Sequence, residues 1–285
     1  MIDLWYDIKK YSSPLLAIAV HDGHQVRQDV AENLLIGEYK RLQEEDPYTG
    51  FFTKIAANRM IINTSRFEVD VNRPREQAIY RTPEQAWGLN VWKDEVPEEV
   101  WEKNLEEYDK FYYLFERIIT EIIEIWGYIL IYDIHSYNYR REGEGGENDN
   151  LINPEVNVGT ATMNRKLWAP VVDYFMQQMG RYNYMGRHLY IRENVRFKGG
   201  YLSEWVHRRF SNQSCVMAIE LKKFYMDENT GAVDIPRLKS LKEALFETVP
   251  GVIQRAQIIQ KERMRPVNIT SLKERNQTKS RIEKK

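Results

Sequence analysis

The sequence predicts an α/β fold, in which the strands of a central sheet alternate with helices along the chain. Short apolar segments typical of buried strands lie at residues 15–20, 128–132 and 215–221. Between them, residues 101–126 and 165–179 place apolar side chains three and four positions apart, which is the spacing of an amphipathic helix. Strands apolar enough to be covered on both faces, when interleaved with helices, are typical of an α/β sheet.

In chain order, the first buried strand is the run Leu-Leu-Ala-Ile-Ala-Val at residues 15–20. Residues 59–71 are expected to be strand-like, and the long helix at residues 101–126 runs directly into the second buried strand. Two further strands are predicted at residues 188–191 and 215–221. The pattern therefore supplies enough strands for one continuous sheet.

The composition of the 285 residues excludes several classes of protein. The 41 Lys and Arg against 42 Asp and Glu leave a net charge of −1, which excludes a basic field over the whole chain for nucleic acid. An apolar content of 42% and an aromatic content of 12% exclude global disorder. The single cysteine, Cys215, excludes an internal disulfide framework and fits a reducing compartment. Since the apolar runs are far shorter than the ~20 residues of a membrane span, we expect a cytoplasmic protein without a membrane partner.

The charge is unevenly distributed along the chain. Residues 261–285 carry nine Lys and Arg and three Glu, a net charge of +6, so residues 1–260 carry −7. We expect this tail to be solvated and partly disordered, and contact with nucleic acid is expected only as a weak interaction of the tail. Residues 140–150, rich in Glu, Gly and Asn, predict a mobile surface loop.

Three of the five histidines directly follow predicted buried strands. His21 and His24 follow the first strand, and His135 follows the second. Ligands of α/β folds gather at the carboxyl ends of strands, and imidazole is a common zinc ligand. The pattern leaves two interpretations open, a metal site and hydrogen-bonded structural histidines. His188 and His207 are interpreted as structural or surface residues.

Two acidic positions also indicate a site. Glu220 lies within an otherwise apolar strand, where an unpaired carboxylate costs several kcal/mol and therefore needs a partner or a role. A salt bridge to an arginine and a general base with a raised pKa are both open. Asp70, Asn72 and Arg73 place an acid, an amide and a guanidinium at the end of another strand, and a guanidinium can bind a carboxylate through two hydrogen bonds.

Taken in order, these motifs resemble the zinc carboxypeptidases and, more closely, the N-formylglutamate amidohydrolases. The resemblance spans about residues 15–230 and rests on five short segments, at residues 21–23, 66–74, 133–136, 197–201 and 219–226. It implies a zinc-carboxypeptidase-like three-layer αβα sandwich with a mixed, largely parallel sheet. Because motifs that meet at one metal are spread from His21 to Glu220, we expect one domain at residues 1–240. A helical and basic extension, partly disordered, would follow at residues 241–285.

The resemblance also implies a zinc site. Its ligands would be His21, His135 and either His24 or Asp46, of which His24 is preferred. Zinc carboxypeptidases take two early ligands from a His-x-x-Glu motif, whereas this sequence has His21-x-x-His24. Glu220 matches the catalytic glutamate of these enzymes and would move protons as a general base and acid.

Further roles follow from the same resemblance. Asp70 would orient His21, Arg73 with Asn72 would hold the α-carboxylate of the substrate, and Arg66 would stabilise the developing oxyanion. The loop after the predicted 188–191 strand would shape the binding pocket through four residues, namely Arg196, Gly199, Gly200 and Tyr201.

The implied reaction is zinc-dependent hydrolysis of a small N-acyl amino acid, such as N-formylglutamate. Two alternatives remain at this stage. One is a zinc carboxypeptidase that acts on peptides, and the other is a non-catalytic binding protein on the same fold. Retention of Glu220 argues against the second alternative, because a binding protein has no chemical need of a general base.

Overall fold

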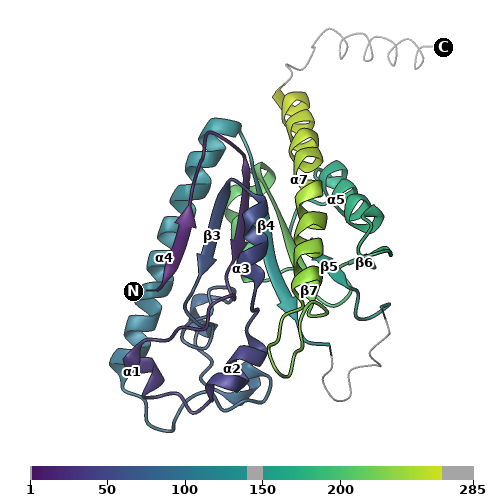
Figure 1. Ribbon diagram of the computed structural model, residues 1–285. Helices are drawn as coiled ribbons and strands as arrows, with labels where there is room; N and C mark the ends of the chain where they lie inside the picture. Colours follow the sequence, from purple (N-terminus) through teal and green to yellow (C-terminus); the bar gives the residue numbers. More distant parts are fainter. Residues whose placement is uncertain (1, 140–149, 265–285) are drawn as a thin grey trace, which may run out of the picture.

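The computed structural model describes residues 2–139 and 150–264, which form one seven-stranded sheet covered by helices (Figure 1). The strands are Leu4–Asp7 (β1), Leu15–Ala19 (β2), Asn58–Ile62 (β3), Ile129–Tyr137 (β4), Val156–Gly159 (β5), Ile191–Glu193 (β6) and Ser214–Lys222 (β7). The α-helices are Gln28–Ala31 (α1), Glu38–Glu44 (α2), Thr49–Phe52 (α3), Glu98–Trp126 (α4), Ala169–Arg181 (α5), Tyr201–Phe210 (α6) and Ile235–Met264 (α7). Short 3₁₀ helices occupy Thr53–Ile55, Arg75–Gln77, Pro83–Ala86 and Ser211–Gln213.

The sheet has the strand order β1-β3-β2-β4-β7-β5-β6. Its four central strands, β3, β2, β4 and β7, are parallel to one another, while β1 and β5 run antiparallel to their neighbours β3 and β7. The prediction of a mixed, largely parallel sheet is therefore confirmed. Because β2, β4 and β7 run in the same direction, their carboxyl ends lie at one edge of the sheet.

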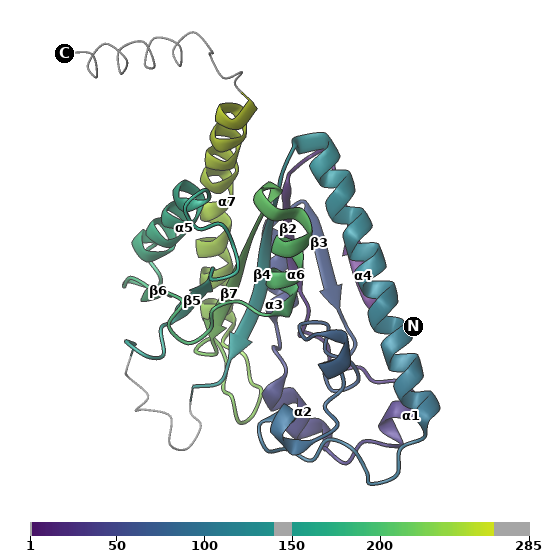
Figure 2. The same ribbon diagram turned by 180° about the vertical axis from the view of Figure 1, so that it is seen from behind.

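Helices cover both faces of the sheet, as Figures 1 and 2 show from opposite sides. Successive side chains of a strand point to opposite faces, so Leu16 and Ile18 of β2 pack with α4 and α6, whereas Leu15 and Ala17 pack with α3, α5 and α7. This arrangement confirms the predicted three-layer αβα sandwich. Among the described residues, no helix combines the length and the apolar character needed to cross a bilayer.

The predicted strand at residues 59–71 ends early, at Ile62. The chain then forms turns, in which the Asp70 carboxylate accepts a hydrogen bond from the backbone N–H of Asn72 at 2.8 Å. Such Asx turns compete with extended structure, because the side chain satisfies a backbone donor locally. Asp70 and Asn72 thus lie on a turn and not on one face of a strand.

Helix α7 crosses the predicted domain boundary at residue 240. Its side chains Leu241, Leu245 and Val252 are buried in the same core as α5 and the sheet. Gly251 allows this close packing, because a Cβ there would lie 2.2 Å from the Tyr174 ring. The helical part of the predicted extension is therefore integral to the αβα body. Its remaining residues, 265–285, and residues 140–149 of the predicted loop lie outside the described parts of the chain.

Candidate active site

A cavity of about 820 Å³ opens at the carboxyl edge of the sheet. Strand β2 leads to this edge with His21, β4 brings His135, and β7 brings Glu220. In α/β folds this edge is the usual place for ligands, since the loops that follow parallel strands converge there. His21 and His135, which were expected just beyond two strands, and Glu220, which was expected within a third, are thus brought into one cavity.

His21, Asp46 and His135 form a compact buried group in this cavity. One ligand atom of each lies within 4.8 Å of those of the other two. The Oδ2 atom of Asp46 lies 3.5 Å from Nδ1 of His21 and 3.1 Å from Nδ1 of His135. Within the described residues, His21 Nδ1 is buried without a hydrogen-bond partner. Two imidazoles and a carboxylate that converge in this way are a suitable donor set for a metal ion.

The charges of the group also fit a cation. Burial alone would raise the pKa of Asp46, but the hydrogen bond with His135 and the neighbouring His21 imidazole hold it well below its ordinary value. Burial likewise would lower the pKa of His135, but the charges of Asp133 and Glu220 raise it well above its ordinary value. Without a metal, the carboxylates therefore favour a proton on His135. A divalent cation would replace such a proton, because metal ligation requires neutral imidazole.

The Asp70 carboxylate contacts the His21 imidazole on the side that faces away from Asp46. Its Oδ1 lies 2.7 Å from Nε2 of His21, and its Oδ2 accepts hydrogen bonds from Arg66 at 2.9 Å and from the Tyr80 hydroxyl. A carboxylate on Nε2 keeps the proton at that nitrogen and directs the Nδ1 lone pair toward the cavity. The geometry is that of the orienting role implied for Asp70.

Glu220 lies beside His135 on the same face of the sheet. The parallel register of β4 and β7 pairs these two residues directly. Alternation along each strand places Glu220 on the face of Val216 and His135 on the face of Ile131, and both of those side chains pack in the core under α4. The sheet itself therefore positions the carboxylate next to the candidate metal ligand.

Burial raises the pKa of Glu220 to about 7, an effect opposed by His135 and reinforced by Asp46 and Asp133. The charges that most affect the Glu220 pKa thus belong to the candidate metal group and its Asp133 neighbour. A carboxyl group with such a pKa can both accept and release a proton near neutral pH. This environment favours the general-base interpretation over the salt bridge.

His24 does not belong to the metal group, and the preference for it over Asp46 is wrong. Its imidazole is 38% exposed and its Nδ1 bonds the Glu45 carboxylate. At Gly23 the chain passes against the residue that follows β3, since a Cβ there would lie 2.2 Å from the carbonyl carbon of Asn63. It continues beside this segment through the bridge of Gln25 with Thr64, and His24 lies outside the cavity lining. Asp46 is instead the third member of the group with His21 and His135, since its backbone N–H donates to the carbonyl of His21 at 2.9 Å.

Five of the residues predicted to bind substrate or stabilise its charge line the cavity, namely Arg66, Asn72, Arg196, Gly199 and Gly200. Arg73 and Tyr201 do not. The Arg73 guanidinium lies over the Tyr80 ring, 4.5 Å from its centroid, and its Nε is 3.8 Å from Asp70. Tyr201 packs against Tyr112. Arg73 does not line the cavity because residues 70–73 form a turn. In a straight strand, its side chain would point in a different direction.

The two glycines of the predicted pocket loop have different reasons to be glycine. Gly199 adopts a φ of +111°, which side chains rarely tolerate. At Gly200, a Cβ would lie 2.3 Å from the Asn72 side-chain oxygen, which accepts the backbone N–H of Leu202 at 2.9 Å. Gly200 thus makes room for the Asn72 side chain.

Sequence reasoning missed several residues of the cavity. Trp87, Lys198 and Lys223 all line it, and the Tyr80 hydroxyl donates a hydrogen bond to Asp70. Lys223 had a recognisable signal, since it lies three positions after Glu220 at the end of a buried strand. Tyr80 had none, because only the folded turn brings it to Asp70.

His207, interpreted as structural, is a buried neutral histidine outside the cavity lining. Its Nε2 accepts the backbone N–H of Val216 at 3.0 Å, and its Nδ1 lies 2.8 Å from the Thr162 hydroxyl. Burial lowers the pKa of His207 to about 4. The imidazole therefore joins α6 to β7 only while it is uncharged.

This histidine should make the stability of the fold depend on pH. Because the unfolded chain binds its proton near pH 6.5, the stabilisation is complete above that pH and is lost as the pH falls toward 4. Between about pH 7 and pH 5 the wild type should lose about 2 kcal/mol of unfolding free energy more than His207→Gln. Urea unfolding at both pH values measures this difference. The exposed-site variant His188→Gln should retain the wild-type loss, and an equal loss in His207→Gln would contradict the prediction.

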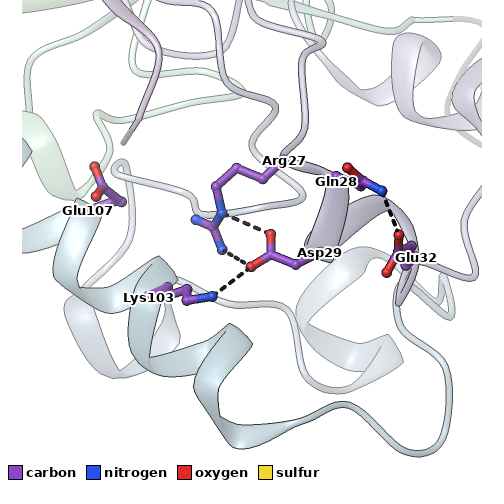
Figure 3. Close-up of a pocket in the computed structure, with 6 residues that line it drawn as sticks. All are labelled: Arg27, Gln28, Asp29, Glu32, Lys103 and Glu107. Carbon is purple, nitrogen blue, oxygen red and sulfur yellow. Dashed lines mark hydrogen bonds and ion pairs between the residues drawn. The ribbon is translucent and has the colours of Figure 1, made fainter.

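A second hollow, of about 620 Å³, lies between α1 and α4 (Figure 3). Its charged side chains bind one another. Asp29 accepts hydrogen bonds from Arg27 at 3.0 Å and from Lys103 at 3.3 Å, and Arg27 also pairs with Glu68. Glu32 and Glu107 also have partners, in Gln28 and Lys110. Since the charged side chains of this hollow are already paired, we assign no chemistry to it.

The chain is similar to several known proteins. A family model described as N-formylglutamate amidohydrolase matches residues 13–226. The crystal structure of N-formylglutamate amidohydrolase from Ralstonia eutropha JMP134 is similar, with a TM-score of 0.70, 13% identity, and coverage of 92% of this chain and 100% of that chain. A gene product of Agrobacterium tumefaciens has a TM-score of 0.59 and 15% identity, with coverage of 90% of this chain and 97% of that chain. A metallo-carboxypeptidase from Burkholderia cenocepacia has a TM-score of 0.33 and 15% identity, with coverage of 88% and 60%. No curated protein matches the sequence.

Proposed function

Because the chain belongs to the N-formylglutamate amidohydrolase family, and is thus an amidohydrolase, we propose that it hydrolyses N-formyl amino acids with the help of zinc. The observation that carries this proposal is the buried group of His21, Asp46 and His135 with Glu220 in the same cavity. N-Formylglutamate is the substrate that the family suggests. Such a substrate is a small anion, and its scissile bond is an amide.

The residues present fit a catalytic zinc. Two histidines and one carboxylate leave a position for water, and both His21 and His135 have a carboxylate near the ring nitrogen that faces away from Asp46. When bound, zinc would polarise the amide carbonyl and lower the pKa of a water molecule toward ~7.

Glu220 carries the proton transfers. Its carboxylate takes a proton from the attacking water as the new C–O bond forms at the formyl carbon. It then gives this proton to the amine nitrogen as the C–N bond breaks, so that formic acid and the free amino acid are formed. Formic acid then loses its remaining proton to the amine or to solvent and leaves as formate. A pKa of about 7 suits both halves of this cycle. Arg66, fixed by Asp70 and Tyr80, lies on the cavity wall where it would stabilise charge on the carbonyl oxygen.

Arg196 is our candidate for binding the substrate carboxylate, in place of Arg73. Its guanidinium lies over the rings of Tyr137 and Phe197, 5.2 and 5.6 Å from their centroids, and donates to Asn153 at 2.6 Å. Asn157 fixes the backbone of this segment, because its side-chain oxygen accepts the N–H of Arg196 at 2.9 Å. A guanidinium held in this way is pre-organised for a carboxylate.

Substitution Arg196→Ala should raise KM for N-formylglutamate by about 10–100-fold with a smaller change in kcat, since a hydrogen bond to a charged group contributes about 1.5–3 kcal/mol. Steady-state kinetics on the zinc-loaded enzyme measure this effect. A formamide without a carboxylate should show no such increase. Arg192→Ala, at an exposed site of β6, is the control and should leave KM unchanged. If Arg73→Ala raises KM and Arg196→Ala does not, the assignment is reversed.

A direct test of the function is a screen of N-formyl and N-acetyl amino acids and short peptides with zinc-loaded protein, by detection of the released amine. Glu220→Gln serves as the blank. We expect turnover of N-formyl amino acids, with acidic ones preferred. Turnover of peptides alone would identify a carboxypeptidase, and no turnover of any amide would contradict the proposal.

A further inference from the structure

Lys223 is a buried cation on the wall of the cavity for which the proposed reaction has no use. Its residue exposure is 1%, and it directly follows β7. Lysine is almost never fully buried unless its charge is paired or hydrogen-bonded, because the loss of hydration costs several kcal/mol. The burial of Lys223 therefore requires a structural or functional reason.

The Lys223 ammonium binds the backbone on both sides of one short segment. Its Nζ donates to the carbonyl of Gln43 at 2.9 Å and to the carbonyl of Glu45 at 2.7 Å. Asp46, the candidate metal ligand, is the next residue along the chain. The two hydrogen bonds thus attach the backbone immediately before Asp46 to the end of the strand that carries Glu220.

Other contacts show that this segment depends on such attachments. It lies where α2 ends, so its carbonyls have no partners within a regular helix or strand. Asn138 donates to the carbonyl of Gln43 at 2.8 Å, and the Tyr225 hydroxyl donates to the carbonyl of Pro47 at 3.2 Å. Of these attachments, only Lys223 reaches both the start of the segment and the residue before Asp46, and only Lys223 adds a positive charge.

We propose that Lys223 is a positioning residue for Asp46. It holds the backbone at residues 43–45 so that the Asp46 carboxylate reaches His21 and His135, and its charge offsets that of Asp46 nearby. This inference rests on the proposed metal site. It predicts that Lys223 raises metal affinity without contacting the metal or the substrate.

The neighbouring Lys222 offers a matched control. It is also buried, at 5% exposure, but its Nζ lies 3.3 Å from the carbonyl of Asn153 and 4.5 Å from the centroid of the Tyr139 ring. These contacts lie on other segments of the chain than residues 43–46, which Lys223 holds. Removal of Lys222 should test for general effects of deleting a buried cation at this strand end.

The experiment measures zinc affinity of the apo full-length chain by competition with a chromophoric chelator. Lys223→Met should weaken zinc binding by about 10–100-fold, the usual cost of removing a group that positions a ligand. Lys223→Arg, which presents donors to the same two carbonyls, should recover most of this affinity. Lys222→Met should stay within about twofold of the wild type. Equal losses in Lys223→Arg and Lys223→Met would overturn the proposal, because they would indicate a packing effect.

A double-mutant cycle with Asp46→Ala identifies the route of the effect. If Lys223 acts through Asp46, then adding Lys223→Met to Asp46→Ala should change zinc affinity by less than about twofold. The same loss in both backgrounds would contradict the proposal. Thermal unfolding in excess chelator confirms that each variant is folded, and Lys223→Gln, which keeps one donor, replaces Lys223→Met should the latter not fold. Failure of the wild type to bind zinc would contradict the proposed function, whereas equal zinc affinities of the wild type and Lys223→Met would contradict this inference alone.

Discussion

Glu220→Gln is expected to retain zinc and to lower kcat by about 10²–10⁴-fold, with little change in KM. The amide has the shape of the carboxyl group, so the pairing of β4 with β7 and the side chain of His135 should remain in place. It cannot accept a proton from water, however, and it cannot return one to the leaving amine. The loss should therefore appear in the chemical step rather than in binding.

Three measurements on this variant separate the proton-transfer role from a structural one. Zinc content should stay at one equivalent, the melting temperature should not fall, and single-turnover rates should show the whole decrease. Glu193→Gln is the control, because Glu193 lies on β6 and pairs with Arg165 outside the cavity lining. Near-normal turnover in Glu220→Gln would reject Glu220 as the general base.

The fold and the centre of the site could be predicted because both follow from local patterns. Apolar runs marked β2, β4 and β7, and the amphipathic spacing marked α4. Parallel strands end at one edge of a sheet, so residues just after or near the ends of these runs had to come together. This reasoning placed His21, His135 and Glu220 in one cavity without any knowledge of the loops.

The remaining site residues depend on loop paths that local patterns do not encode. The spacing His21-x-x-His24 resembles a pair of ligands, but Gly23 packs against the end of β3 and His24 bonds to Glu45. Asp46 reaches the site only because its backbone bonds to His21. Such contacts join segments more than twenty residues apart, which periodicity and propensity within a short window cannot detect.

The same limit explains the exchange of arginines. Asp70 to Arg73 were expected on a strand, where alternation would have fixed the direction of each side chain. The Asx turn at Asp70 removes this alternation and places Arg73 over Tyr80. Arg196 instead lines the cavity, because the Asn157 side chain holds its segment. The Asx turn at Asp70 and the Asn157 side chain thus decide together which guanidinium lies on the wall.

Removal of zinc should have the other large effect, a complete loss of turnover together with lower stability. His21, Asp46 and His135 are buried with two more carboxylates, Asp133 and Glu220, nearby. Without the cation, this cluster must retain protons or leave negative charges unbalanced. Zinc present at 100 times its Kd contributes about 2.7 kcal/mol, which corresponds to a decrease of roughly 5–10 °C in Tm on chelation for a domain of this size.

Differential scanning calorimetry with and without chelator, followed by re-addition of zinc, measures this change and its reversal. His135→Asn should show neither the zinc-dependent Tm shift nor turnover, because one ligand is missing. Glu220→Gln should keep the full shift while turnover stays low, since proton transfer and metal binding reside in different side chains. A wild-type protein that contains no stoichiometric zinc, and whose Tm does not respond to chelator, would reject the metal site. In that case, Glu220 would have to activate the attacking water without a metal ion. Of the residues assigned to the hydrolysis step, Arg66 alone would then supply a positive charge to stabilise the oxyanion.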